Sequence, residues 1–296
     1  MTSEIVISKN TTLVEQDKYF FDYIDVSKKT KETYKLNLKP FMVYMSENNI
    51  TQPTRQDIIE YRETLRKTLK PTTVNSYMIA LRQFFSWLEY MRIYPNVALN
   101  IKGEKISNTH KKRALTKEQA KEMINSTNNL RDKCLLKLLF TTGLRSNEVK
   151  NAKIEDIKTV GGKNILFVLG KGKTEKTDYV ILDDNILNDL KAYIGERTNG
   201  NIFIPLYRKT NENGLTNRQI RGIVKRYLLQ IGLDSDEYSC HSTRHTFINL
   251  GFELGNDIYT ISKEARHSNI RTTEIYLEEY NKLNSKVASE ISNLLN

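Results

Sequence analysis

A basic stretch without apolar periodicity divides this sequence. Residues 101–113, IKGEKISNTHKKR, repeat no apolar residue at helical or strand spacing. The stretch holds one acidic residue and five basic ones: Lys102, Lys105, Lys111, Lys112 and Arg113. This composition is typical of an exposed linker that can touch a phosphate backbone; the alternative is a solvated surface loop. We therefore expect two domains, at 13–100 and 114–296, joined by the linker 101–113.

The segment 13–100 contains four runs in which apolar residues recur at helical spacing. Ser27 and Thr54 stand where helix N-caps are expected, and Pro71 suits the first position of a long helix. Pro95 ends that helix or follows its end. Four helices in fewer than 100 residues predict a small α-helical domain.

The segment 114–296 mixes helices with a few strands. A helix is expected after Thr116, and the next one ends near Gly143. Residues 165–169 and 180–182 read as two strands joined by the polar turn GKGKTEKTD, a hairpin. The remaining helices are expected at 185–195, 216–231, 243–253 and 257–264, with a helical tail from about 269. The chain is thus predicted to be mainly α, with a mixed α+β second domain that contains a small antiparallel sheet.

Charge favours a polyanionic partner. Lysine and arginine number 46 against 35 acidic residues, a net charge of +11, and nucleic acid is the usual partner of such an excess. The plainer interpretation is a protein from a lysine-rich proteome. Of the two cysteines, Cys134 lies in an apolar run and is expected in the core, and Cys240 has no CxxC partner. Without a signal-like N-terminus or a membrane-length apolar segment, we expect a cytoplasmic protein.

Two cations lie beside glycines. Arg145, in TTGLRSNEV, follows a glycine at a helix boundary, where its guanidinium can clamp a phosphate with two hydrogen bonds. Lys171 lies in GKG at the hairpin, where glycines let a backbone approach a ligand closely. Taken alone, each residue is more simply interpreted as an ordinary surface cation.

The segment CHSTRHTF gathers ionisable side chains. His241 and Arg244 are three residues apart, on one face of the start of a helix, and His245 is expected to face elsewhere. His241 and His245 also form HxxxH, but a zinc peptidase motif needs glutamate where Ser242 stands. We therefore expect no metal and no other cofactor.

The segment EARHSNIRTTEIYLEEY contributes His267 and Tyr276. The chain has 16 tyrosines, and Tyr276 also fits the apolar face of an amphipathic helix with Ile275 and Tyr280. Composition and spacing alone therefore do not select Tyr276 as a functional residue.

Four motifs taken together do select Tyr276 as a functional residue. The pieces TGLRSNEV, LGKGKTEK, HSTRHTF and ARHSNIRTTEIY, in this order, resemble the signature of tyrosine recombinases, the family of phage integrases and Xer-type enzymes. The resemblance covers 114–280, and the four-helix pattern resembles the family's core-binding, SAM-like DNA-binding domain. It implies that segment 114–296 is a catalytic domain with a C-terminal docking helix.

The resemblance implies six catalytic residues: Arg145, Lys171, His241, Arg244, His267 and the nucleophile Tyr276. Glu148 matches an acidic position that supports them. The chain departs from the pattern at Arg266, where glycine is common, and at Ser239 and Cys240, which replace an apolar-Pro pair. These departures put local geometry in question and remove no catalytic group.

The mechanism implied is strand cleavage through a 3′-phosphotyrosine and a free 5′ hydroxyl. Two arginines suit the charge of the transition state, and His267 adds a hydrogen bond to the same oxygens. His241 is the candidate base for Tyr276, and Lys171 the candidate acid for the leaving oxygen. The bond formed resembles the bond broken, so religation needs neither ATP nor metal.

The resemblance also implies partners. These are double-stranded DNA with inverted half-sites, a homotetramer that exchanges strands through a Holliday junction, and, as a further partner, an accessory protein that sets direction. The linker cations Lys102, Lys105, Lys111, Lys112 and Arg113 are expected to contact DNA, which would place the enzyme at the nucleoid. The apolar residues Val287, Ile291, Leu294 and Leu295 could dock on a neighbouring subunit or pack on their own domain. The short leader favours a compact recombinase, Xer-like or borne by a mobile element, that integrates, excises or resolves DNA.

Two other functions compete with recombination. A DNA-binding regulator without chemistry suits the charge but leaves six catalytic groups unexplained. A type IB topoisomerase shares the nucleophile chemistry but relaxes DNA as a monomer, which leaves the docking stripe unexplained.

Overall fold

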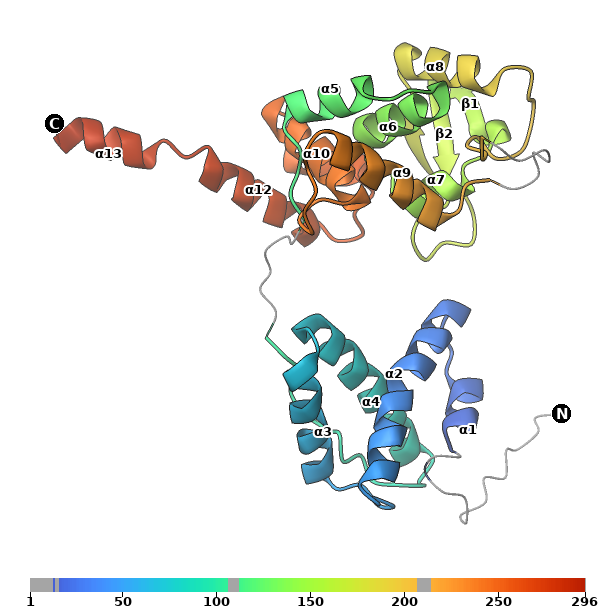
Figure 1. Ribbon diagram of the computed structural model, residues 1–296, viewed down its shortest axis with the longest axis vertical. Coiled ribbons are helices and arrows are strands. Elements are labelled where there is room, and N and C mark those ends of the chain that lie inside the picture. The colour runs from blue at the N-terminus through green and yellow to red at the C-terminus, as the bar shows by residue number, and fades with distance from the viewer. Residues whose placement is uncertain (1–12, 14–15, 106–111, 207–213, 296) are drawn as a thin grey trace. The chain divides into compact units, whose positions relative to one another are not determined.

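The structure is a computed structural model that describes residues 13, 16–105, 112–206 and 214–295 (Figure 1). These residues form two compact units, one on each side of the segment 106–111. Each unit has its own hydrophobic core. Lys111 of the expected linker lies outside the described residues.

The first unit is built from helices. They are α1 (Gln16–Tyr23), α2 (Lys28–Glu47), α3 (Arg55–Thr68) and α4 (Pro71–Tyr90). The side chain of Ser27 accepts the Thr30 amide, and Thr54 forms a capping box with Asp57, so both predicted N-caps are confirmed. Pro71 is the first residue of α4, as expected, because its missing amide hydrogen costs nothing there.

Aromatic side chains fill the core of this unit. Phe20, Phe84 and Trp87 contact one another, with the rings of Phe20 and Phe84 edge to face at 5.5 Å between centroids. Phe41 and Phe85 extend the cluster, and all five are at most 4% exposed. This core holds α1, α2 and α4 together.

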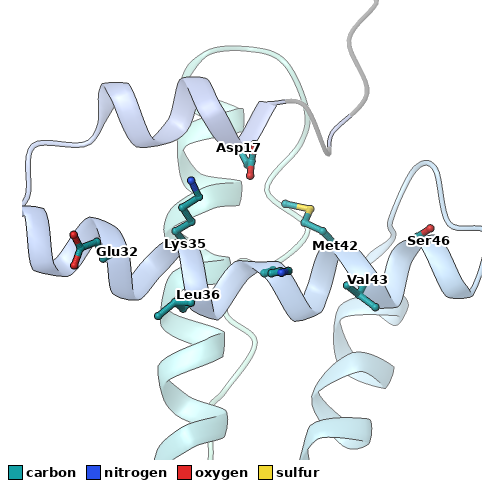
Figure 2. A pocket seen from close by; sticks show the side chains of 8 residues that line it. Asp17, Glu32, Lys35, Leu36, Met42, Val43 and Ser46 are labelled. Atoms are coloured by element: carbon teal, nitrogen blue, oxygen red, sulfur yellow. The ribbon is translucent and has the colours of Figure 1, made fainter.

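A groove of about 840 Å³ lies beside α1 and α2 of the first unit (Figure 2). Asp17 comes from α1, whereas Leu36, Met42 and Val43 line the groove from α2. None of the catalytic residues implied by the sequence lies in it.

The second unit combines helices with a small sheet. Its helices are α5 (Lys117–Asn125), α6 (Leu130–Thr142), α7 (Ser146–Asn151), the short 3-10 helix η1 (Ile154–Asp156), α8 (Asp184–Ile194), α9 (Asn217–Gln230), α10 (Cys240–Glu253), α11 (Ile258–Glu264), α12 (Arg271–Leu283) and α13 (Val287–Leu295). Its strands are β1 (Ile157–Val160), β2 (Lys163–Val168) and β3 (Asp178–Ile181). The mainly α fold with a small antiparallel sheet is the one expected from the sequence.

The sheet has the order β1-β2-β3 with antiparallel pairing throughout. Ile165 pairs with Ile181 and Val168 with Asp178, which confirms the predicted hairpin and places Lys171 in its loop. Strand β1 was not expected, because its sequence IKTV does not alternate apolar and polar residues.

Helix α6 runs through the main core of the second unit. Its residues Cys134, Leu135, Leu138 and Leu139 are at most 1% exposed, so the expected core position of Cys134 is confirmed. Helix α6 ends at Gly143, whose φ of 58° lies in the left-handed region that glycine adopts without steric cost. This ending aims the chain into α7 and thereby positions Arg145.

A smaller core joins α10, α11 and α12. It contains Ile248, Phe252, Ile261, Ala265 and Tyr276. The candidate nucleophile is therefore held by the packing of its helix against α10 and α11.

Helix α13 buries none of its residues. Its apolar residues Val287 and Ile291 are 59% and 50% exposed, and Leu294 and Leu295 exceed 80%. Packing of this stripe on its own domain, one of the two alternatives, is therefore not found. Among the described residues, no helix is long and apolar enough to cross a membrane.

Candidate active site

Arg145 and Glu148 form the first element of the site. Arg145 is the N-cap of α7, and its Nη1 lies 2.8 Å from Glu148 Oε1. Glu148 Oε2 accepts the Arg145 backbone amide at 2.8 Å. The carboxylate is 2% exposed while the Arg145 side chain keeps a quarter of its surface open. Glu148 thus orients a cation that still faces solvent.

Arg244 lies behind this pair on α10 and is almost fully buried. Its Nη1 donates to the Gly143 carbonyl at 2.6 Å, and its Nη2 donates to the Ala265 carbonyl. Burial and the neighbouring cations Arg145 and Arg266 lower the pKa of Arg244 to about 9. The guanidinium remains protonated at neutral pH and has two fixed backbone acceptors, so its orientation is set before any ligand arrives.

His241 is at the start of α10, as predicted, and keeps solvent contact. Partial burial lowers the pKa of His241 below its usual 6.5, and the cations Arg221, Arg244 and Arg145 lower it further. The imidazole is therefore mostly neutral at pH 7, the form that can accept a proton.

Tyr276 packs among histidine rings. Its ring centroid is 5.0 Å from that of His245 and 6.2 Å from that of His267, the latter nearly parallel. Tyr276 is 6% exposed, and burial raises its pKa to about 12. The cations of Arg244 and Arg145 act in the opposite direction, so the tyrosine lies within reach of both guanidinium charges.

His267 is fixed by the start of α12. Its Nδ1 lies 2.7 Å from Thr273 Oγ1, and its backbone amide donates to the Ser262 carbonyl at 3.0 Å. The contact with Thr273 fixes the plane of the imidazole ring beside Tyr276.

The structure thus brings together five of the six residues implied by the sequence, and for the sixth, Lys171, it shows no hydrogen bond or ion pair with the described residues. Lys171 is exposed in the loop between β2 and β3, next to Gly172 with its φ of 80°. Within the same loop, Lys173 pairs with Asp178 at 2.7 Å and Lys176 donates to the Asn151 carbonyl at 2.7 Å.

Sequence reasoning missed two residues of this site. His245 was expected to face elsewhere, yet its ring contacts Tyr276 because helix α12 crosses α10 at that point. Arg266 was regarded only as a departure from the usual glycine, yet its Nη2 lies 3.1 Å from Glu148 Oε2. The one signal in the sequence was Glu148, three residues after Arg145, because a carboxylate that is buried beside one arginine can pair with a second cation.

Three guanidiniums and one carboxylate give this site a positive charge. Arg145, Arg244 and Arg266 surround Glu148, and a tyrosine lies beside them. Such a site can bind a phosphate oxyanion and stabilise additional negative charge on it. Among the described residues, no group of three or more His, Cys, Asp or Glu side chains could hold a metal ion.

Comparison with known proteins gives consistent matches over both units. The family model "Phage integrase family" matches residues 113–282, and "Phage integrase, N-terminal SAM-like domain" matches 18–90. Tyrosine recombinase XerA of Pyrococcus furiosus is 30% identical over 93% of this chain and 93% of its own length. The XerA of Pyrococcus horikoshii is 28% identical over 90% of this chain and 89% of its own.

Solved structures share the fold. XerH site-specific recombinase bound to palindromic difH substrate, a post-cleavage complex, matches with a TM-score of 0.73 and 22% identity over 94% of this chain and 84% of that one. A lambda integrase tetramer bound to a Holliday junction matches with a TM-score of 0.69 and 14% identity over 89% of this chain and 76% of that one.

Proposed function

The chain belongs to the phage integrase family, and from this premise we propose that it cuts and rejoins DNA strands through Tyr276 as a site-specific recombinase. One observation carries the assignment of the nucleophile. The ring of Tyr276 is held against those of His245 and His267, where the charges of Arg244 and Arg145, the two cations best placed to hold a phosphate, oppose the rise of its pKa that burial causes.

The proposed reaction follows from these positions. The Tyr276 oxygen attacks the scissile phosphorus, its proton passes to His241, and the bond to the 5′ oxygen breaks. The products are a 3′-phosphotyrosine and a 5′ hydroxyl that takes its proton from Lys171. Arg145 and Arg244 donate to the non-bridging oxygens, where negative charge accumulates in the transition state. His267 contributes a further hydrogen bond to the same oxygens.

We propose that Lys171 takes up this role once DNA is bound. Its loop is exposed, and the cations at positions 173 and 176 are tied back to the protein. We propose that bound DNA draws the free end of Lys171 toward the leaving oxygen. A loop lysine that reaches its position only on DNA would couple cleavage to correct docking.

The pH dependence of cleavage tests the base. A pKa of His241 below 6.5 means that its neutral form predominates down to weakly acidic pH, so the cleavage rate should stay level at neutral pH and fall as pH drops through that pKa. We expect the acid midpoint of the single-turnover rate below about pH 6.5. His241→Ala should slow cleavage by about 10²-fold and remove this acid limb. An acid limb that persists unchanged in His241→Ala would assign the base elsewhere.

We propose that the enzyme works as a homotetramer on double-stranded DNA with two inverted half-sites. The relatives support this, since lambda integrase forms a tetramer on a Holliday junction and XerH binds a palindromic substrate. An accessory protein that sets the direction of recombination would act on that assembly.

The C-terminal helix is the proposed link between subunits. The exposed stripe Val287, Ile291, Leu294 and Leu295 is too apolar to remain in water without a partner. A cavity of about 360 Å³ in the same unit offers an apolar acceptor, lined by Phe247, Leu250, Leu254, Ile261 and others. We propose that α13 of one copy docks in this cavity of the next, and the 82% exposure of Leu254 fits such a contact.

A charge on this stripe should prevent assembly. Ile291→Lys would bring an unpaired ammonium into an apolar cavity, so we expect tetrameric complexes on two-half-site DNA to weaken by at least about 100-fold. Ser289→Lys adds the same charge to the opposite face of α13 and is the matched control. Analytical ultracentrifugation on DNA measures both, with half-site binding by single copies unchanged. Equal complexes with the two variants would rule out docking through this face.

We propose that the cations of the linker contact DNA phosphates. Lys102 and Lys105 are exposed at the end of the first unit. Lys112 donates to the Asp236 carbonyl, and Arg113 is 3.4 Å from Glu237, so both begin from contacts within the second unit. Such exposed pairs contribute little and are easily exchanged for phosphates.

The proposed function is tested on sites that the protein itself selects. Duplexes recovered by binding from a random pool supply the site, and a plasmid with two copies supplies the substrate. Recombination should resolve or invert the plasmid according to the orientation of the sites. Relaxation alone, on plasmids with or without the site, would favour a type IB topoisomerase, and binding alone a regulator.

A further inference from the structure

The backbone of Arg266 has a conformation that arginine rarely adopts. Its φ is 55°, in the left-handed region, where a side chain costs about 1 kcal/mol or more. The residue follows the C-cap of α11, its amide donates to Lys263, and the amide of His267 donates to Ser262. This is the Schellman ending of a helix, where glycine is the favoured residue. An arginine kept at this position indicates that its side chain has a use.

The side chain of Arg266 is buried and held from several directions. It is 7% exposed, its Nη1 donates to the Glu264 carbonyl at 2.7 Å, and its Nη2 lies 3.1 Å from Glu148 Oε2. Longer hydrogen bonds reach the carbonyls of Thr142 and Gly143 at 3.4 Å. Arg266 therefore ties the end of α11 to the turn that leads into Arg145.

Arg145 is held by Arg266 in two ways. Both arginines share the carboxylate of Glu148, one at each oxygen, and Arg145 Nη2 also donates to the Arg266 carbonyl at 3.4 Å. The left-handed backbone directs that carbonyl toward Arg145 and the side chain toward Glu148 at the same time. A carboxylate between two guanidiniums has less freedom to rotate than one beside a single guanidinium.

We propose that Arg266 is a positioning residue: through Glu148 and its own carbonyl, it fixes the orientation of Arg145 toward the scissile phosphate. The inference rests on the proposed function for its consequence in cleavage, but its structural part concerns Arg145 alone. Arg266 acts through Arg145 and is not placed in contact with the reacting atoms.

Single-turnover cleavage by Arg266→Gly tests the proposal. Glycine suits the backbone, so folding and DNA affinity should be preserved, whereas a loosened Arg145 should slow cleavage by about 10- to 100-fold. Arg266→Lys keeps the charge but not the two-pronged geometry and should recover part of the rate. Arg92→Gly is the matched control, because Arg92 is an exposed arginine of the first unit with a φ of 56°.

Non-additivity separates positioning from a general structural effect. In an Arg145→Ala background, Arg266→Gly should cause no further loss of rate, since the residue through which it acts is gone. An equal loss in both backgrounds, or a wild-type rate in Arg266→Gly, would overturn the proposal.

A measurement without cleavage keeps the two proposals distinguishable. In protein labelled with ¹⁵N-arginine, the Arg145 guanidinium should give a restricted side-chain signal that becomes mobile in Arg266→Gly and not in Arg92→Gly. If Arg145 stays restricted, the positioning role is wrong even if the enzyme cleaves DNA. If the wild type never cleaves while Arg145 loosens as expected, only the proposed function fails.

Discussion

Tyr276→Phe is expected to abolish the covalent protein–DNA complex and to lower strand cleavage by more than about 10⁴-fold, because the attacking oxygen is removed. The ring of Tyr276 remains to fill the small core between α10, α11 and α12. The free energy of unfolding should therefore change by only about 1 kcal/mol. DNA binding should persist, since it depends on phosphate contacts made elsewhere.

Tyr280→Phe is the matched control for this prediction. Tyr280 lies one turn further along α12 and stacks on Phe252 at 5.8 Å between ring centroids, on the same small core. The variant removes an equivalent hydroxyl from the same helix and should cleave at the wild-type rate. Covalent complex that survives in Tyr276→Phe and disappears in Tyr280→Phe would transfer the nucleophile to Tyr280.

Arg244→Ala is expected to lower the cleavage rate by at least about 10³-fold. The buried guanidinium is oriented by the carbonyls of Gly143 and Ala265, so its stabilisation of the phosphate needs no rearrangement in the transition state. Arg244→Lys should recover little, because an ammonium cannot keep two carbonyls and a phosphate oxygen in one plane.

Arg131→Ala separates loss of chemistry from loss of stability. Arg131 is also buried, at 7% exposure, and pairs with Asp132 at 2.7 Å. This pair lies at the N-terminal end of α6, whereas Arg244 contacts Gly143 at the C-terminal end. Its removal should lower the melting temperature while the cleavage rate of the folded protein stays within about threefold of the wild type. If Arg244→Ala lost rate only in proportion to its loss of folded protein, its assignment to catalysis would be wrong.

The elements with local sequence signals were predictable. Ser27, Thr54 and Thr116 cap their helices through side-chain oxygens, and Gly143 ends α6 in the left-handed conformation. These signals depend on a few neighbouring residues, so the sequence reveals them. Strand β1 and helix α7 are short and lack such periodicity, and they form because the rest of the unit packs around them.

The site was only partly predictable, because it joins residues far apart in the chain. The order of four motifs indicated Arg145, His241, Arg244, His267 and Tyr276, which the fold brings together. The contact of His245 with Tyr276 depends on how α12 crosses α10, and the contact of Arg266 with Glu148 depends on how α11 ends. The local sequence predicts neither the angle at which α12 packs on α10 nor the left-handed backbone of Arg266.

The pKa of Tyr276 also could not be predicted from the sequence, although its place on the apolar face of an amphipathic helix indicated burial. Its pKa near 12 means that the phenol is protonated at neutral pH, and the two arginines lower that pKa only in part. A phosphate bound by these arginines would reduce their effect on the phenol further. A base such as neutral His241 is therefore needed at the moment of attack.

Trapping the covalent intermediate and locating its bond tests most directly whether Tyr276 is the nucleophile. The protein is incubated, without added metal, with a duplex that carries a selected site and a nick just downstream of the cleavage position, so that the short fragment is lost. Trypsin then releases residues 272–282, TTEIYLEEYNK, which contain both Tyr276 and Tyr280, and fragmentation of this peptide by mass spectrometry separates the two. We expect a nucleotide on Tyr276. A nucleotide on Tyr280 or on any other residue would contradict this expectation.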